Sequence, residues 1–214
     1  AAAQANQPAA PAAILAVLAR EDVPAWRATL LDLLTPFERT APVVAVAQTA
    51  LTARDPLERA AAVRLLNGHA PSHDRLHALL QDPVRLVRLD AAWALSAELP
   101  ENSPSRRELD AYFALSADQP GGRLRIGQDL ANRGRYAEAE KSIKLAVQWD
   151  PNSPGIYEAL GFVHNAQGAA QPAAAAFFRA AQLQPNDAPS AYRAALAFAE
   201  ARQPADAEMA FRQA

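Results

Sequence analysis

The sequence predicts an all-α protein, an α-solenoid built from helix-turn-helix repeats. Three observations predict this fold class. Ala, the strongest helix former, is abundant, whereas only 8 of the 214 residues are Gly. The long alternating runs of Val and Ile that indicate strands are missing. Two sequence patterns recur at intervals of about thirty residues, which is typical of stacked helical repeats.

The first eleven residues, within "AAAQANQPAAPAA", contain only Ala, Gln, Asn and Pro. This composition predicts a flexible or polyproline-like linker over residues 1–11. The chain does not begin with Met, and two interpretations stay open: an interdomain linker, or the mature end that remains after removal of a signal peptide.

Three copies of one pattern occupy the first half of the chain. "DPLERAAAVRLL" begins at Asp55 and "DPVRLVRLDAAWAL" at Asp82, while "DVPAWRATLLDLL" from Asp22 is a weaker copy. Asp followed by Pro predicts a helix start, because Asp caps the first turn and Pro fits the first helical position. The short apolar helix that precedes each copy is expected at residues 12–20, 42–53 and 72–81.

Each copy carries an Arg at the same place. Arg27, Arg59 and Arg88 are each followed by an apolar residue three positions later and by a Leu seven positions later. We expect each guanidinium to pair with an acidic side chain of its own or an adjacent repeat, which is a structural role. The pattern resembles HEAT-type repeats, and the resemblance covers residues 12–100.

A joining segment follows at residues 101–119, within "ENSPSRRELDAYFALSADQPGG". Ser-Pro-Ser near its start and Pro-Gly-Gly at its end predict a single helix over roughly residues 105–117. We expect this helix to pack one array against the other, with these side chains pointing inward: Leu109, Tyr112, Phe113 and Leu115.

A second pattern, "GFVHNAQGAAQPAAAAFFRAAQLQP", recurs once before and once after this copy, with a period of about 34 residues. We expect Gly161 and Ala173 to be small because two helices cross there at close range. Phe177 is expected to fill the space between successive repeats. Gly168 is expected in the turn between helices, and Pro185 to end the second helix. The pattern resembles the tetratricopeptide repeat (TPR), with motifs at residues 120–153, 154–187 and 188–214.

The TPR resemblance implies a concave groove lined by the first helix of each repeat. Its side chains are a mixture of aromatic and amide groups with few charges, which suits an extended peptide or a partner loop. Phe162 stands where some family members carry the Asn of a carboxylate clamp, so binding of chaperone tails is disfavoured. The alternative is a merely solvated groove, or one that faces the first array. The groove positions are Leu124, Gln128, Asn132, Glu158, Phe162, Asn165, Tyr192, Arg193 and Leu196.

His69, His73 and His77 follow one another at intervals of four positions. His73 and His77 share a helix face and could chelate zinc or copper, or give an axial ligand to an external haem. Pro71 separates His69 from that helix, and no carboxylate completes a metal set, so solvent-facing His is the competing interpretation. We expect no cofactor in this segment itself. His164 is expected to pack.

Several functions are excluded by composition and motifs. The chain has no Cys, so it contains no disulfide, thiolate metal site or thioether-bound haem. Its net charge of −2 without a basic patch argues against nucleic acid, and no apolar run approaches the ~20 residues of a membrane span. Nucleophile elbow, phosphate loop and HExxH motifs are missing, so we expect no enzyme.

The order of the two arrays resembles the C-terminal region of a group of bacterial multihaem c-type cytochromes. The resemblance implies an exported, periplasmic protein, with haem in the parent polypeptide or in a c-type cytochrome partner. The expected function is a scaffold for protein–protein interaction. Two alternatives stay open: a direct role in electron transfer, by giving a His ligand to a haem or covering its edge, and a stand-alone TPR adaptor.

Overall fold

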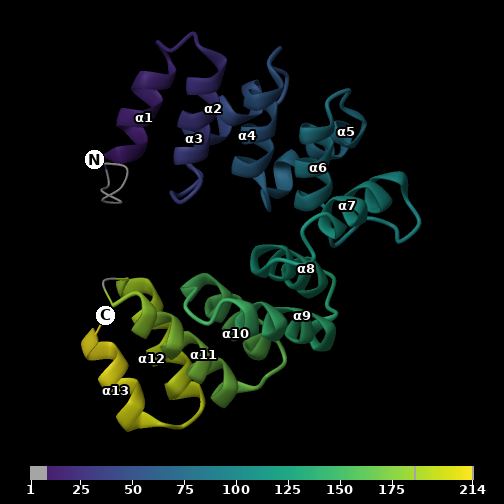
Figure 1. The fold of residues 1–214 in the computed structure, drawn as a ribbon. Coiled ribbons are helices and arrows are strands. Elements are labelled where there is room, and N and C mark those ends of the chain that lie inside the picture. Colours follow the sequence, from purple (N-terminus) through teal and green to yellow (C-terminus); the bar gives the residue numbers. More distant parts are fainter. Residues whose placement is uncertain (1–8, 186, 214) are drawn as a thin grey trace. The chain divides into compact units, whose positions relative to one another are not determined.

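The computed structural model describes residues 9–185 and 187–213, and within these ranges it contains 13 α-helices and no strand (Figure 1). The predicted all-α, helical-repeat fold is therefore confirmed. Among the described residues, no helix combines the length and apolar character that a bilayer crossing requires. The chain divides into two compact units, Ala1–Leu109 and Asp110–Ala214, and the division falls within one helix.

The first unit consists of short helices arranged in pairs. Helices α2, α4 and α6 pack against one another in series, α1 packs on α2, and α3 on α4. Leu31, Val43 and Val63 are fully buried between them. The helices are α1 (Ala10–Leu18), α2 (Pro24–Leu33), α3 (Ala41–Ala50), α4 (Pro56–Leu66), α5 (His73–Ala78) and α6 (Arg85–Ala94), followed by α7 (Pro104–Ala114).

Asp and Pro start these helices in different ways. The Asp55 carboxylate accepts a 2.8 Å hydrogen bond from the Leu57 amide, and α4 begins at Pro56 as expected. The Asp82 carboxylate likewise accepts from the Val84 amide at 2.8 Å, but α6 begins only at Arg85. The expected start at residue 83 is therefore wrong, although the Asp side chain makes the same contact to the amide two residues ahead at both places.

Two of the preceding helices also differ from the prediction. Helix α1 begins at Ala10, within the expected linker, because Pro at the first turn needs no hydrogen bond from its nitrogen. Residues 1–8 lie outside the described residues. The helix expected at 72–81 is broken into a 3-10 turn (Ala70–Ser72), α5 and a second 3-10 turn (Leu79–Gln81).

A row of Arg side chains ties each helix pair to the next. In every case the guanidinium binds a carboxylate further along the chain and donates to two backbone carbonyls that precede its own helix. The predicted pairing with an adjacent repeat is confirmed for Arg27 and Arg59, whereas Arg88 pairs with Glu108 of the joining segment. The pairs are Arg27–Glu58, Arg59–Asp82 and Arg88–Glu108, with shortest N···O distances of 2.7, 2.8 and 2.7 Å.

Helix α7 continues this row because it carries Glu108. Leu109 and Phe113 are buried as expected, but Leu115 is 71% exposed. The inward orientation predicted for Leu115 is wrong, because Leu115 lies six positions after Leu109, which is off the helix face of Leu109 and Phe113, and because the helix already ends at Ala114.

The second unit consists of three helix pairs, in which each helix packs on the next along the chain. Pro185 lies in the turn that follows α11, as expected. Two buried clusters form the core, one around Ile143 and one around Phe177. The helices are α8 (Pro120–Asn132), α9 (Tyr136–Trp149), α10 (Pro154–Ala166), α11 (Ala170–Leu183), α12 (Ala188–Glu200) and α13 (Pro204–Gln213).

Glycine allows the two helices of a pair to approach closely. A Cβ atom at Gly161 would lie 2.7 Å from the Phe177 ring, and one at Gly127 would lie 2.4 Å from Ile143 Cγ1. Real Cβ contacts are not this short, so the predicted close crossing is confirmed. Phe177 also joins a cluster with Ala194 of the next repeat, in agreement with its predicted place between repeats.

The turns inside the three helix pairs of this unit share one backbone conformation. Gly134 and Gly168 have positive φ angles of 72° and 73°, and Arg202, at the equivalent place in the last pair, has a φ of 58°. In each turn the next amide donates back across the turn, for example from Gln203 to the Phe198 carbonyl at 2.9 Å. Arg202 therefore stands in a left-handed conformation that favours Gly.

Replacing Arg202 with Gly is expected to raise the free energy of unfolding by about 1 kcal/mol, because the left-handed strain disappears. Thermal and urea unfolding followed by circular dichroism measure the change. Arg202→Ala is the matched control, since it removes the side chain but keeps a Cβ at positive φ. Equal stability of the Gly and Ala variants would contradict the assignment of strain to this residue.

A candidate protein-binding groove

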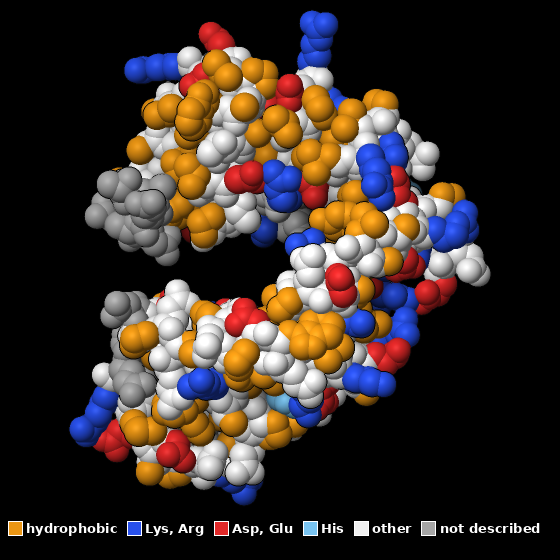
Figure 2. Space-filling model, viewed as in Figure 1, with side chains coloured by type: hydrophobic (Ala, Val, Ile, Leu, Met, Phe, Trp, Pro, Cys, Tyr) orange, Lys and Arg blue, Asp and Glu red, His pale blue; other side chains and the backbone are white. Residues whose placement is uncertain are grey.

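The predicted groove residues lie on α8, α10 and α12, which are the first helices of the three pairs. Figure 2 shows hydrophobic side chains at the surface of this unit, with single acidic and basic groups among them. Three hydrophobic residues of the predicted set are exposed: Phe162, Tyr192 and Leu196 are 53%, 51% and 42% exposed. Aromatic side chains such as Phe162 and Tyr192 are enriched at protein–protein interfaces.

A cavity of about 290 Å³ lies among α8, α9 and α10. Gln128 and Asn132 line it from α8, and Phe162 lines it from α10, so the structure brings these three predicted residues together. Ala159 and Val163 add apolar surface from α10. A recess that is apolar and bordered by amides can hold one apolar side chain of a peptide while the amides bind its backbone.

A polar network lies beside this cavity. Arg193 on α12 donates to the Glu158 carboxylate on α10, and the Ser190 hydroxyl is 2.6 Å from the same carboxylate. The Arg193 guanidinium also lies 5.9 Å from the centre of the Phe162 ring, within the range of a cation–π interaction. The network joins two successive repeats and holds the exposed Phe162 ring in one orientation.

Aromatic edge contacts support the remaining exposed rings. Phe162 packs edge-on against Phe177, with ring centres 5.1 Å apart, and Tyr192 packs in the same way against Phe211 at 5.8 Å. Each exposed ring is thereby held by a neighbour from the second helix of its own repeat. Such pre-ordered aromatic side chains lose little conformational freedom when a partner binds.

Leu124 and Asn165, two of the predicted groove residues, do not line this cavity. Leu124 is half-buried and packs against the cluster around Ile143, so it contributes to the core. Asn165 is exposed and does not line the cavity. The sequence analysis did not predict Tyr136, which lines the cavity from α9, the second helix of the first pair. It also missed Ala159 and Val163, although their spacing from Phe162 places all three on one helix face.

The histidines of the first unit form a separate cluster. The ring centres of His73 and His77 are 6.3 Å apart, and His73 Nε2 lies 2.6 Å from a carboxylate oxygen of Glu98. His69 and His73 line a cavity of about 340 Å³ together with Glu98. Within residues 9–185 and 187–213, no group of three or more His, Asp or Glu side chains is arranged to hold a metal ion. His164 is buried, 8% exposed, in α10.

Glu98 sets the protonation of His73. Its hydrogen bond and its negative charge raise the pKa of His73 above the ordinary value of 6.5. The pair therefore favours the folded state below pH 6.5, and this contribution is lost as the pH rises through the raised pKa. We expect Glu98→Gln to lower the pKa of His73, measured by NMR titration of the ring, with His69 as an internal reference. An unchanged His73 pKa would contradict the contact.

The comparisons with known proteins agree with this fold. No protein-family model matches the sequence, and no curated protein matches it. A solved structure, that of a thermophilic TPR protein of Thermus thermophilus, superposes with a TM-score of 0.52 and 21% sequence identity. The match covers 82% of this chain and 97% of that protein. The chain thus has a TPR-like helical-repeat fold.

Proposed function

We propose that this chain is a non-catalytic scaffold that binds an extended segment of a partner protein on the face formed by α8, α10 and α12. The observation that carries the proposal is the pairing of exposed, pre-ordered Phe162 and Tyr192 with the amide-bordered cavity of about 290 Å³. Apolar anchors enter such recesses, and amide side chains bind the backbone of the peptide. The TPR-like fold of the solved neighbour supports the same kind of function.

The proposal is tested by photo-crosslinking at the groove. A benzoylphenylalanine residue replaces Tyr192 in one variant and Lys141, on the second helix α9, in the control. We expect a discrete crosslinked partner from position 192 only, and we expect Phe162→Ser in the same chain to abolish it. Equal crosslinking from both positions, or a product that is insensitive to Phe162→Ser, would exclude the groove as the binding surface.

We further propose that the helix pairs of the first unit are HEAT-like and that the partner or parent polypeptide is an exported c-type cytochrome. The repeating Arg pairs support the HEAT-like assignment. The cytochrome context rests on the order of the repeats in the sequence. A gel of native extract, probed with antibody to this chain and stained for covalent haem, tests it. A haem-positive band well above 22.8 kDa supports it, and a haem-free band at 22.8 kDa favours a stand-alone adaptor.

The alternative role in electron transfer makes a separate prediction. If His73 ligates a haem, titration of the chain with haem shifts the Soret band, and His73→Ala removes the shift. In the structure His73 Nε2 already contacts Glu98, so a haem would have to displace that carboxylate. Absence of a shift would exclude this alternative.

A further inference from the structure

The two ends of the groove differ in charge. Every described residue that lines the cavity of about 290 Å³ is uncharged, and Gln128, Asn132 and Phe162 are among them. The end formed by α10 and α12 instead carries the ion pair of Glu158 and Arg193. Because complementary charges decide which partner a surface accepts, the α10–α12 end specifies the charge of the segment that binds there.

Two carboxylates converge on one hydroxyl at this end. The Ser190 hydroxyl lies 2.6 Å from a Glu158 oxygen and also contacts the Asp187 carboxylate. A hydroxyl has one proton, so it donates to only one of the two carboxylates at a time. Arg193 donates to Glu158 and brings one positive charge. Two carboxylates thus share one proton donor and one guanidinium, and one negative charge stays uncompensated.

A third carboxylate lies on the groove face of α12. Tyr192, Leu196 and Glu200 follow one another at intervals of four residues, so they share one side of the helix. All three are exposed. Glu200 forms no ion pair with any residue that the structure describes. These groups form the acidic end of the groove: Glu158, Asp187, Glu200 and the single guanidinium of Arg193.

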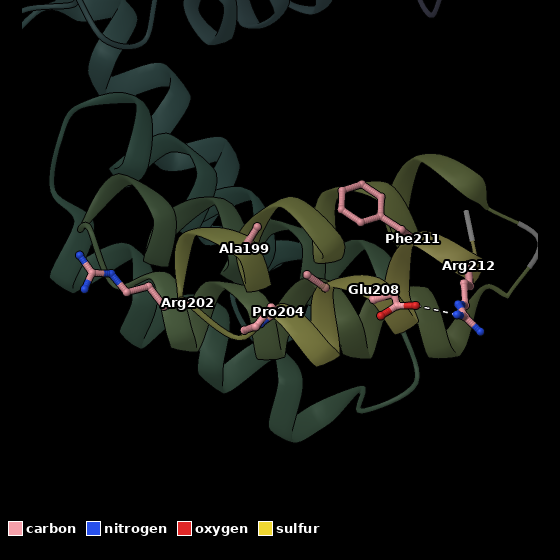
Figure 3. A pocket seen from close by; sticks show the side chains of 7 residues that line it. Ala199, Arg202, Pro204, Glu208, Phe211 and Arg212 are labelled. Carbon is pink, nitrogen blue, oxygen red and sulfur yellow. Dashed lines mark hydrogen bonds and ion pairs between the residues drawn. The ribbon is translucent and has the colours of Figure 1, made fainter.

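The other guanidinium groups of the last helix pair line a different cavity. Arg202 and Arg212 lie at a recess of about 690 Å³ beside α13, and Arg212 pairs there with Glu208 at 2.6 Å (Figure 3). Among the described residues of α12 and α13, Arg193 is therefore the cation that contacts the acidic end. The acidic end has more negative than positive charge and complements a cation.

We propose that the segment bound in this groove places an apolar side chain in the cavity and a Lys or Arg side chain, roughly three positions away, on the acidic end. The inference rests on the proposed function and names the chemistry of its partner. Extended chain advances ~3.3 Å per residue, so roughly three residues span the ~10 Å between neighbouring helices. The cation supplies the hydrogen-bond donors that the carboxylates lack, and the exposed Tyr192 ring offers it a cation–π contact.

A display library of short random peptides, selected on the complete chain, is the first probe. We expect the selected peptides to share an apolar residue and a Lys or Arg roughly three positions from it. Selection on Glu200→Lys should keep the apolar residue and lose the basic one. Selection on Phe162→Ser should give no shared motif, because this residue forms a wall of the cavity.

One selected peptide is then labelled and its affinity is measured by fluorescence anisotropy. Glu200→Lys is expected to weaken binding roughly tenfold, because an attractive contact becomes a repulsive one. A peptide with Glu in place of its basic residue should regain affinity on that variant. Glu208→Lys is the matched control, since it makes the same charge change at the α13 recess, and it should leave the affinity unchanged. Circular dichroism checks that each variant is folded.

The outcomes separate this inference from the proposed function. Selected peptides that share an apolar residue without a basic one, or with an acidic one, would overturn the inference and leave the groove as the binding surface. No shared motif, or binding that Phe162→Ser does not change, would overturn both. A dimer of the unaltered chain in light scattering that Phe162→Ser abolishes would make a second copy the occupant, and would also overturn the inference.

Discussion

Phe177→Ala is expected to lower the free energy of unfolding by about 3 to 5 kcal/mol, the cost of deleting a buried Phe and leaving a cavity. The ring is 4% exposed and lies in a cluster with Ala194 and Phe198 of the next repeat. It also rests on Gly161, where no Cβ could be accommodated. The cavity would therefore open at the junction of two repeats. Urea unfolding followed by circular dichroism measures the loss.

Phe211→Ala is the matched control for this prediction. It deletes the same side chain at the equivalent repeat position, but Phe211 is 44% exposed, so the expected loss is below about 1 kcal/mol. A loss below about 1 kcal/mol for Phe177→Ala, or equal losses for the two variants, would show that the repeat register is wrong.

Arg59→Met is expected to lower the free energy of unfolding by about 3 kcal/mol, because it leaves the Asp82 carboxylate buried without its partner. The Arg59 and Asp82 side chains are only 12% and 5% exposed, and two hydrogen bonds of 2.8 and 3.0 Å join them. A double-mutant cycle with Asp82→Asn isolates the coupling. Arg135→Met, from the exposed Arg135–Glu138 pair, is the control and should cost less than about 1 kcal/mol.

The same pair makes stability depend on pH. Burial alone would raise the pKa of Asp82, but the hydrogen bonds from Arg59 and from the Val84 amide outweigh it, and the pKa lies below its ordinary value of 3.8. The stabilisation is therefore present above pH 3.8 and is lost as the pH falls through the lowered pKa. The Arg59→Met variant should lose less stability on acidification than the unaltered chain. An equal acid response would contradict the pairing.

Local features of the sequence predicted much of the fold. The period of the second pattern identified three helix pairs, and the Gly residues of that pattern were placed correctly at a helix crossing or a turn. The Arg of the other pattern was expected to pair with an acidic side chain of its own or an adjacent repeat, and Arg27 and Arg59 pair with an adjacent repeat. These features were predictable because each depends on only a few residues. The helix period, the cap at a helix start and the small side chain at a helix crossing are all local patterns.

Other features depend on contacts between distant residues. Tyr136 lines the groove cavity because α9 turns back beside α10, and no repeated residue marks its position. Glu98 lies 25 positions after His73 in the sequence, so no local motif predicted the contact between the two side chains. Leu115 was expected to point inward but is exposed, because it lies off the helix face of Leu109 and Phe113 and beyond the end of α7.

The sequence by itself predicted the helical-repeat fold, the helix pairs of the second unit and the pairing of Arg27 and Arg59 in the first. Only the tertiary structure decided which side chains line the groove and that Phe211 is exposed while Phe177 is not. The physical reason is that periodicity specifies which face of a helix is apolar, whereas burial depends on whether another helix lies against that face.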